Sequence, residues 1–255
     1  MPALISNTLR WTFVLGLAVT SSAGSEHPTS AQPASGSAAT KAALSKDPPG
    51  MKRLLPDADL WIDSKHKRIV LDGKVCLTGG PLEMFACIEG TKEHESIISV
   101  PIKAYAVHAG LMAVGAKPGQ PVQFRPTYKP ATGTAIDIEL IWADKKGAVH
   151  RQKARNWIRN VKTGKPLDSG WVFAGSSFWD DPGTGQRHYL AQGGDFICVS
   201  NFPDAMLDLP VESSQAGAEL LFEALTEAIP PKGTKVRLVL TPRLEKQNET
   251  QNQKK

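Results

Sequence analysis

Hydrophobic and polar residues alternate over several short segments of the chain. The segment 135–142 alternates most strictly, which predicts a strand with one solvent-facing side that carries Asp137 and Glu139. Runs of β-branched and aromatic residues predict further strands. These strands are 69–77, 82–88, 96–100, 171–175, 195–199 and 235–241.

The segment 103–116 has a helical spacing instead. Pro101 suits the entry to a helix, and Lys117-Pro118-Gly119 ends it. The residues that share one face of this helix are Tyr105, His108, Leu111, Met112 and Gly115. His108 is therefore expected to be a core histidine with one hydrogen-bonded nitrogen.

The connections between the strands determine the expected fold. Gly79-Gly80 is typical of a two-residue hairpin turn, so strands 69–77, 82–88 and 96–100 are expected to form an antiparallel meander. The pattern over 215–228 fits either a helix or a strand. We therefore predict a single α+β domain with a largely antiparallel sheet and one or two helices.

Composition divides the chain into four parts. Residues 1–23 combine one arginine, a short apolar run and small residues, as in a secretory signal peptide. Residues 24–50 are rich in Ser, Ala, Thr and Pro and predict a disordered linker, and 243–255 predict a disordered polar tail. The folded domain is then 52–242. We expect an exported protein, periplasmic or extracellular, with no membrane span once the signal is removed.

The net charge of +5 does not indicate a nucleic-acid partner. Residues 52–242 hold 23 Lys and Arg against 21 Asp and Glu, so most of the excess lies in the terminal segments. A domain with this balance has no general field for polyanions, and export also argues against nucleic acid.

The three cysteines allow at most one disulfide within the chain. In the expected hairpin, Cys76 faces Glu83 and Cys87 faces Asp72, so these two cysteines are out of register for a bridge. Cys87 and Cys198 are the more suitable pair if a disulfide forms. Buried thiols are an equally reasonable alternative.

An acidic turn that contains a histidine, residues 89–95, is the candidate metal site. Carboxylates and a neutral imidazole suit Zn²⁺ or a similar divalent cation. The candidate ligands are Glu89, His94 and Glu95, with His108 as a fourth if the helix packs over the turn. The same turn is also typical of a solvated hairpin tip, and no spaced zinc motif is present. The sequence itself requires no cofactor.

The segment Lys145–Lys165 contains eight Lys or Arg and no acidic residue. Arg151, Lys153 and Arg155 could hold an anionic polysaccharide, another cell-surface polymer or an acidic protein. Trp157 could add a stacking face. A solvated strand or helix face is the alternative.

Several blocks of the sequence resemble the YdjY domain family. These blocks are 82–98, 105–111, 115–119, 171–176 and 193–197, and together they cover most of 54–242. The resemblance implies an exported protein of planctomycete-type bacteria with no established activity. Some members carry ferredoxin-like cysteine runs, but three scattered cysteines do not provide an iron–sulfur site here.

Three hypotheses for the function follow. The first is a non-enzymatic binding or accessory module whose partner is a protein or a cell-surface polymer, and it is favoured because no motif identifies a reaction. The second is a metal-dependent hydrolase, which requires the four candidate ligands to converge beside a pocket. The third is adhesion to an anionic polymer through the basic segment 145–165.

Overall fold

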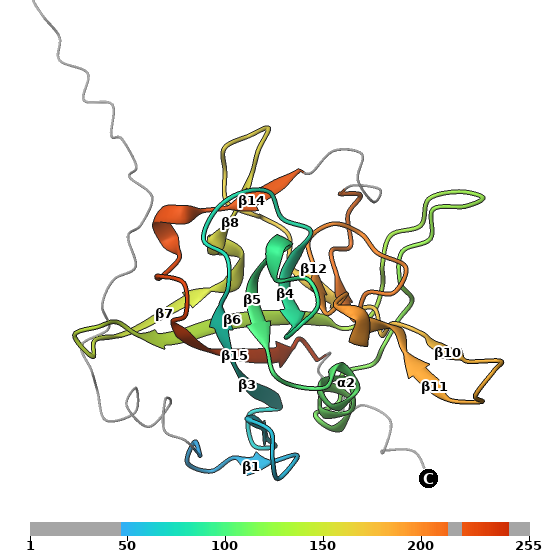
Figure 1. Cartoon of the computed structure of the whole chain (residues 1–255), viewed down its shortest axis with the longest axis horizontal. Coiled ribbons are helices and arrows are strands. Elements are labelled where there is room, and N and C mark those ends of the chain that lie inside the picture. The colour runs from blue at the N-terminus through green and yellow to red at the C-terminus, as the bar shows by residue number, and fades with distance from the viewer. Residues whose placement is uncertain (1–46, 214–220, 245–255) are drawn as a thin grey trace, which may run out of the picture.

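The computed structural model describes residues 47–213 and 221–244 (Figure 1). The expected signal peptide, most of the linker, nearly all of the polar tail and the first part of 215–228 lie outside these residues. The described part of that last segment forms strand β14 (Phe222–Ala224) and a 3-10 helix (Thr226–Ala228). No helix within 47–213 or 221–244 is long and apolar enough to cross a membrane.

The largest sheet has eleven strands. Their bounds are β1 (Lys52–Arg53), β2 (Leu60–Asp63), β3 (Arg68–Val75), β4 (Met84–Ile88), β5 (Ser96–Val100), β6 (Ala135–Ala143), β7 (Val149–Lys153), β9 (Trp171–Phe173), β12 (Ile197–Cys198), β13 (Leu207–Asp208) and β15 (Lys235–Pro242). Two separate ribbons are formed by β10 (Phe178–Asp180) with β11 (Arg187–Tyr189), and by β8 (Ile158–Asn160) with β14. The α-helix of the described residues is α2 (Ala104–Ala113), and shorter 3-10 helices are η1 (Glu93–Glu95), η2 (Ala154–Trp157) and η3 (Leu190–Gly193).

Eight strands of the large sheet close into a barrel. Their order is β3-β15-β6-β9-β13-β12-β4-β5, and β5 pairs with β3 to complete the ring. Most neighbours are antiparallel, but β4 runs parallel to β5 and β12 runs parallel to β13. The expected α+β fold is therefore wrong, because the described chain is mostly β and its sheet is closed.

The error comes from strand pairing, which the local pattern does not determine. The hairpin expected at Gly79-Gly80 does not form, because β3 pairs with β2, β5 and β15 while β4 pairs with β5 and β12. Residues 89–95 instead lead the chain back along β4, so that β5 starts beside Met84. This segment is a crossover between parallel strands, and its two ends lie at opposite ends of β4.

Gly73 lies where the barrel closes. The edge of β3 pairs with β2 over Arg68–Leu71 and with β5 over Lys74–Val75. A Cβ atom on Gly73 would lie 2.8 Å from the carbonyl oxygen of Ser99. The missing side chain therefore allows β5 to approach β3 and complete the ring.

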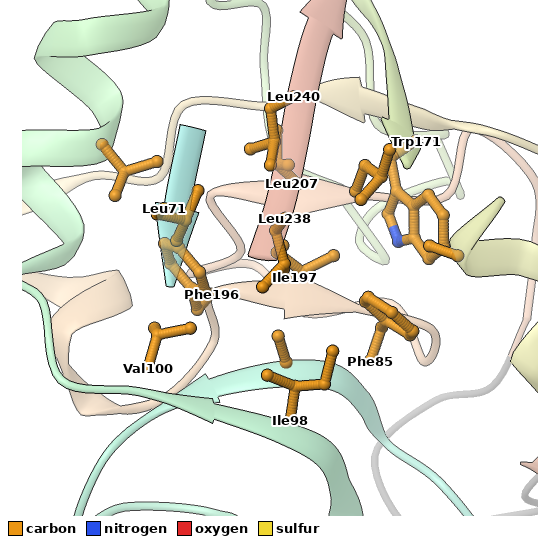
Figure 2. Packing of buried hydrophobic residues seen from close by; sticks show 14 of the residues in the cluster. Leu71, Phe85, Ile98, Val100, Trp171, Phe196, Ile197, Leu207, Leu238 and Leu240 are labelled. Atoms are coloured by element: carbon orange, nitrogen blue, oxygen red, sulfur yellow. The ribbon is translucent and has the colours of Figure 1, made fainter. Parts of the chain in front are cut away.

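Side chains fill the interior of the barrel. Figure 2 shows them converging from strands in different parts of the ring. Examples that are at most 2% exposed are Leu71 of β3, Phe85 of β4, Ile98 of β5, Trp171 of β9 and Leu238 of β15. An eight-stranded barrel is just wide enough to be filled in this way, so we expect the functional surface on its outside.

The helix expected over 103–116 is confirmed as α2, which lies outside the barrel near the β10–β11 ribbon (Figure 1). Lys103 precedes the helix without a side-chain cap. The side-chain oxygen of Gln192 in η3 accepts the backbone N–H of Ala104 at 2.9 Å instead. This bond satisfies one of the free donors at the helix N-terminus and ties α2 to the segment that follows the ribbon.

Candidate functional site

The structure does not bring the candidate metal ligands together. Glu89 follows the last residue of β4 and forms an ion pair with Lys74. Glu95 lies at the other end of β4, where its carbonyl accepts the backbone N–H of Glu83. Five extended residues separate the two ends by roughly 16 Å. The crossover therefore places these two carboxylates apart.

The two histidines of the candidate set are also separate. His94 is 76% exposed, and its Nε2 lies 3.7 Å from Oε2 of Glu95. His108 contacts the β10–β11 ribbon instead. In the part of the chain that the structure describes, no group of three His, Cys, Asp or Glu side chains is arranged to hold a metal ion. The hydrolase hypothesis therefore lacks the convergent site that it requires.

A lysine lies at the centre of the acidic groups around the crossover. The Nζ atom of Lys92 is 3.0 Å from Asp195, 3.6 Å from Glu95 and 4.0 Å from Glu83. It also lies 4.5 Å from the ring centroid of Phe202. Burial alone would lower the pKa of Lys92, but the carboxylates raise it, so the ammonium stays charged. Burial and the neighbouring Glu95 raise the pKa of Glu83. The cluster thus fixes the crossover to the barrel.

His108 lies half-buried between aromatic rings. Its Nδ1 is 2.9 Å from the hydroxyl oxygen of Tyr189, and that hydroxyl donates to the carbonyl of Gly175 at 3.0 Å. Because the Tyr189 proton is used in this bond, we assign a proton to Nδ1 of His108, which donates to Tyr189. Burial lowers the pKa of His108, and its ring packs edge-on against Phe173 at 4.7 Å. The expectation of one satisfied nitrogen is confirmed, but His108 is half-buried outside the barrel rather than a core histidine.

Part of the helix face that carries His108 is exposed, which differs from the expected core face. Tyr105 is 53% exposed and Met112 is 51% exposed. The buried residues of α2 are Ala104, Ala106, Val107, Gly110 and Leu111. The β10–β11 ribbon contacts this helix face at His108, which lies between Tyr105 and Met112 in the sequence. The turns on either side of that contact are therefore open to solvent.

The β10–β11 ribbon presents an exposed aromatic side chain on each face. Phe178 pairs with Tyr189, with ring centroids 5.1 Å apart, and Trp179 pairs with His188. Consecutive residues of a strand point to opposite faces, so Phe178 shares the face of Tyr189 and Trp179 lies on the other. Phe178 is 54% exposed and Trp179 is 49% exposed. The hydrophobic pattern alone does not indicate these strands, although two aromatic residues before the Asp181-Pro182-Gly183 turn are typical of a strand end.

The structure divides the predicted polyanion site. Arg151 pairs with Glu139 at 2.5 Å. Trp157 is fully buried, so it offers no stacking face. Lys153 and Arg155 line a groove in the barrel wall. Only part of the candidate set therefore faces a space that a ligand could enter.

All three cysteines are buried free thiols, so the suggested disulfide between Cys87 and Cys198 is absent from this structure. Cys198 lies opposite Met84 on β4 rather than opposite Cys87. The neighbouring Cys76 thiol lowers the pKa of Cys87, although burial opposes the shift. Complete burial of Cys87 keeps the thiol from solvent.

The fold and its surface define a β-barrel protein with a helix and an aromatic ribbon attached to the outside. The chain belongs to the YdjY domain family, which matches residues 60–241. The resemblance inferred from the sequence blocks is therefore confirmed. No curated protein and no solved structure matches the chain.

Proposed function

We propose that this YdjY-type chain is a non-catalytic binding module that docks onto a protein partner outside the cytoplasm. Three exposed side chains support this role, and they are called the apolar surface below: Tyr105, Met112 and Phe178. They lie on α2 and β10, which the contacts of Tyr189 with His108 and with Phe178 hold together. Monomeric proteins rarely leave large apolar side chains grouped in this way without a function.

The residue types of the apolar surface suit a protein partner. Tyr, Phe, Met and Arg are enriched in protein interfaces, and the Arg187 guanidinium lies 4.9 Å from the Phe178 ring centroid. No residue of α2 is acidic, and the exposed side chains of Lys103 and Lys117 flank the helix. Charge complementarity therefore points to a partner segment with apolar side chains bordered by Asp or Glu.

The ribbon adds a second contact. Trp179 lies on the face opposite Phe178, so one flat partner surface would leave one of these rings in solvent. A partner that encloses the ribbon covers both rings. Aromatic anchors of this kind typically contribute most of the binding energy of an interface.

The arrangement of the polar groups supports a binding role over the hydrolase hypothesis. The carboxylates near the crossover surround Lys92, and burial favours the neutral form of His108, whose Nδ1 bonds to Tyr189. These groups stabilise the fold around them and leave no convergent acid–base pair.

The short apolar run and the small residues of 1–23 support export, with cleavage before Gly24.

The test compares partner retention by matched variants in the native host. One variant carries Met112→Ser with Phe178→Ser. The control carries Val161→Ser with Val211→Ser, which change two exposed valines outside the apolar surface. Each tagged protein is purified from the fraction outside the cytoplasm, where we expect a mature chain that begins at Gly24. Wild type and control should retain the same partner protein, and the apolar-surface variant should retain at least tenfold less.

Circular dichroism of each variant checks that the fold is intact. Equal retention by the apolar-surface variant, or equal loss in the control, would contradict the proposed surface. A partner segment without acidic residues would contradict the charge argument. Full-length protein found only in the cytoplasm would contradict export.

A further inference from the structure

A groove opens where β6 changes its pairing partner. Ala135–Ile136 pair with β9, whereas Glu139–Ala143 pair with β7, so Asp137–Ile138 lie at a fork between the two strands. The groove at this fork has a volume of about 510 Å³. That volume is within the range of small-molecule sites. Its residues are not those of the apolar surface.

Ion pairs neutralise part of the charge in the groove. Asp137 makes two hydrogen bonds with Arg243, at 2.6 and 2.7 Å, and this contact lowers the pKa of Asp137. Glu139 is paired with Arg151. Both carboxylates are therefore occupied by arginines.

Two further cations have no carboxylate within ion-pair distance among the described residues. They are Lys153 and Arg155. Arg155 donates one hydrogen bond to the backbone carbonyl of Asp168 at 3.2 Å, which positions its guanidinium at the groove. Lys153 and Arg155 are both positive and the Asp168 carboxylate is negative, so together they leave the groove with about one excess positive charge. The groove is therefore suited to a ligand with one negative charge.

The uncharged lining is mainly apolar. It includes Ala135, Val172 and Pro210, and the backbone of Gly170 lies beside them. An apolar body with a charged end would satisfy both parts of the groove. Small-molecule sites are usually mainly apolar pockets that contain a small number of polar groups.

We propose that this groove binds the carboxylate of a ligand with an apolar body, held by Lys153 and Arg155. The guanidinium can donate two parallel hydrogen bonds to a carboxylate, and the lysine adds a second cation. A phosphate dianion fits less well, because the groove has only about one excess positive charge to balance its two negative charges. The carboxylate can belong to a free organic acid or to an acidic polymer.

Titration of the ¹⁵N-labelled mature protein tests the proposal. The probes are 4-phenylbutyrate, its uncharged amide, inorganic phosphate and an oligogalacturonate. We expect 4-phenylbutyrate to shift the backbone resonances of 135–139 and 168–172, and Lys153→Gln with Arg155→Gln to weaken its binding at least tenfold. Lys146→Gln, an exposed change outside the groove lining, should leave the affinity unchanged.

The probes also distinguish the source of the carboxylate. Tighter binding per carboxyl group by the oligogalacturonate supports a polymer ligand, and tighter binding by 4-phenylbutyrate supports a free acid. Either result supports the site. Equal binding of the uncharged amide, stronger binding of phosphate, or shifts confined to other parts of the barrel would overturn it.

Discussion

Asp208 in β13 is fully buried, and only one of its carboxylate oxygens is well satisfied. The Oδ1 atom accepts hydrogen bonds from the Asn201 side chain at 3.1 Å and from the Leu209 amide at 2.8 Å. The Oδ2 atom has no hydrogen-bond partner among the described residues. Burial raises the pKa of Asp208 to about 7. The folded protein therefore favours the protonated carboxyl up to near-neutral pH.

This pKa predicts a pH-dependent difference between wild type and Asp208→Asn. Between the unfolded pKa of about 4 and the folded value, the folded state holds the extra proton, so the Asp208 contribution falls as pH rises through that window. Asparagine keeps the acceptor oxygen without a charge. At pH 8 the variant should be more stable by about 2 kcal/mol, because the free energy gained by removing the buried charge exceeds the cost of leaving the asparagine N–H groups unpaired.

Urea unfolding of both proteins from pH 4 to pH 8 measures this difference. The stability advantage of the variant should grow with rising pH and level off above pH 7. A constant difference across the range, or a variant that is less stable at pH 8, would show that Asp208 is ionised without penalty in the fold.

Single residues were predicted best where their role depends on near neighbours in sequence. The spacing over 103–116 placed His108 on a helix, and the alternation in β6 placed Asp137 outward. The partners of Lys92 could not be predicted, because Asp195 lies far along the chain and reaches it only in the closed barrel. Burial of Trp157 was missed because the basic residues around it suggested a solvated segment.

At the scale of elements, the hydrophobic pattern located α2 and most long strands. It did not determine their neighbours, since β4 and β5 follow each other in sequence yet pair in parallel. Gly79-Gly80 predicted a hairpin that does not form. Gly73 permits the closure of the barrel, but no sequence pattern marks it for that role. The metal hypothesis treated residues 89–95 as one turn, and the crossover that these residues form separates its ligands.

Gly73→Ala should test the closure between β3 and β5. The added Cβ would lie within 3 Å of Ser99, Ile98 and Val100, so we expect a loss of about 1–3 kcal/mol in the free energy of unfolding. Gly193→Ala is the matched control, because a Cβ there meets nothing within 4 Å. Thermal unfolding should show a lower Tm for the first variant and an unchanged or slightly higher Tm for the second. Equal Tm values would mean that the closure tolerates the methyl group.

At the scale of the whole molecule, the filled barrel directs binding to its exterior. Figure 1 shows α2 and the β10–β11 ribbon outside the ring of strands. The ribbon and helix supply the apolar surface, and the fork in β6 supplies the charged groove. The sequence indicated Lys153 and Arg155 as anion-binding residues, but neither surface as a whole could be predicted, because each combines segments that are brought together only by the closed sheet.

The proposed binding role requires α2 and the β10–β11 ribbon to dock onto one protein partner. The most direct measurement places a photoreactive phenylalanine analogue at Met112 or Phe178 in the native host, with Val161 and Val211 as control positions. Irradiation should give an adduct with the same partner from the first two positions and none from the controls. Adducts with unrelated proteins, or equal adducts from all four positions, would contradict the claim.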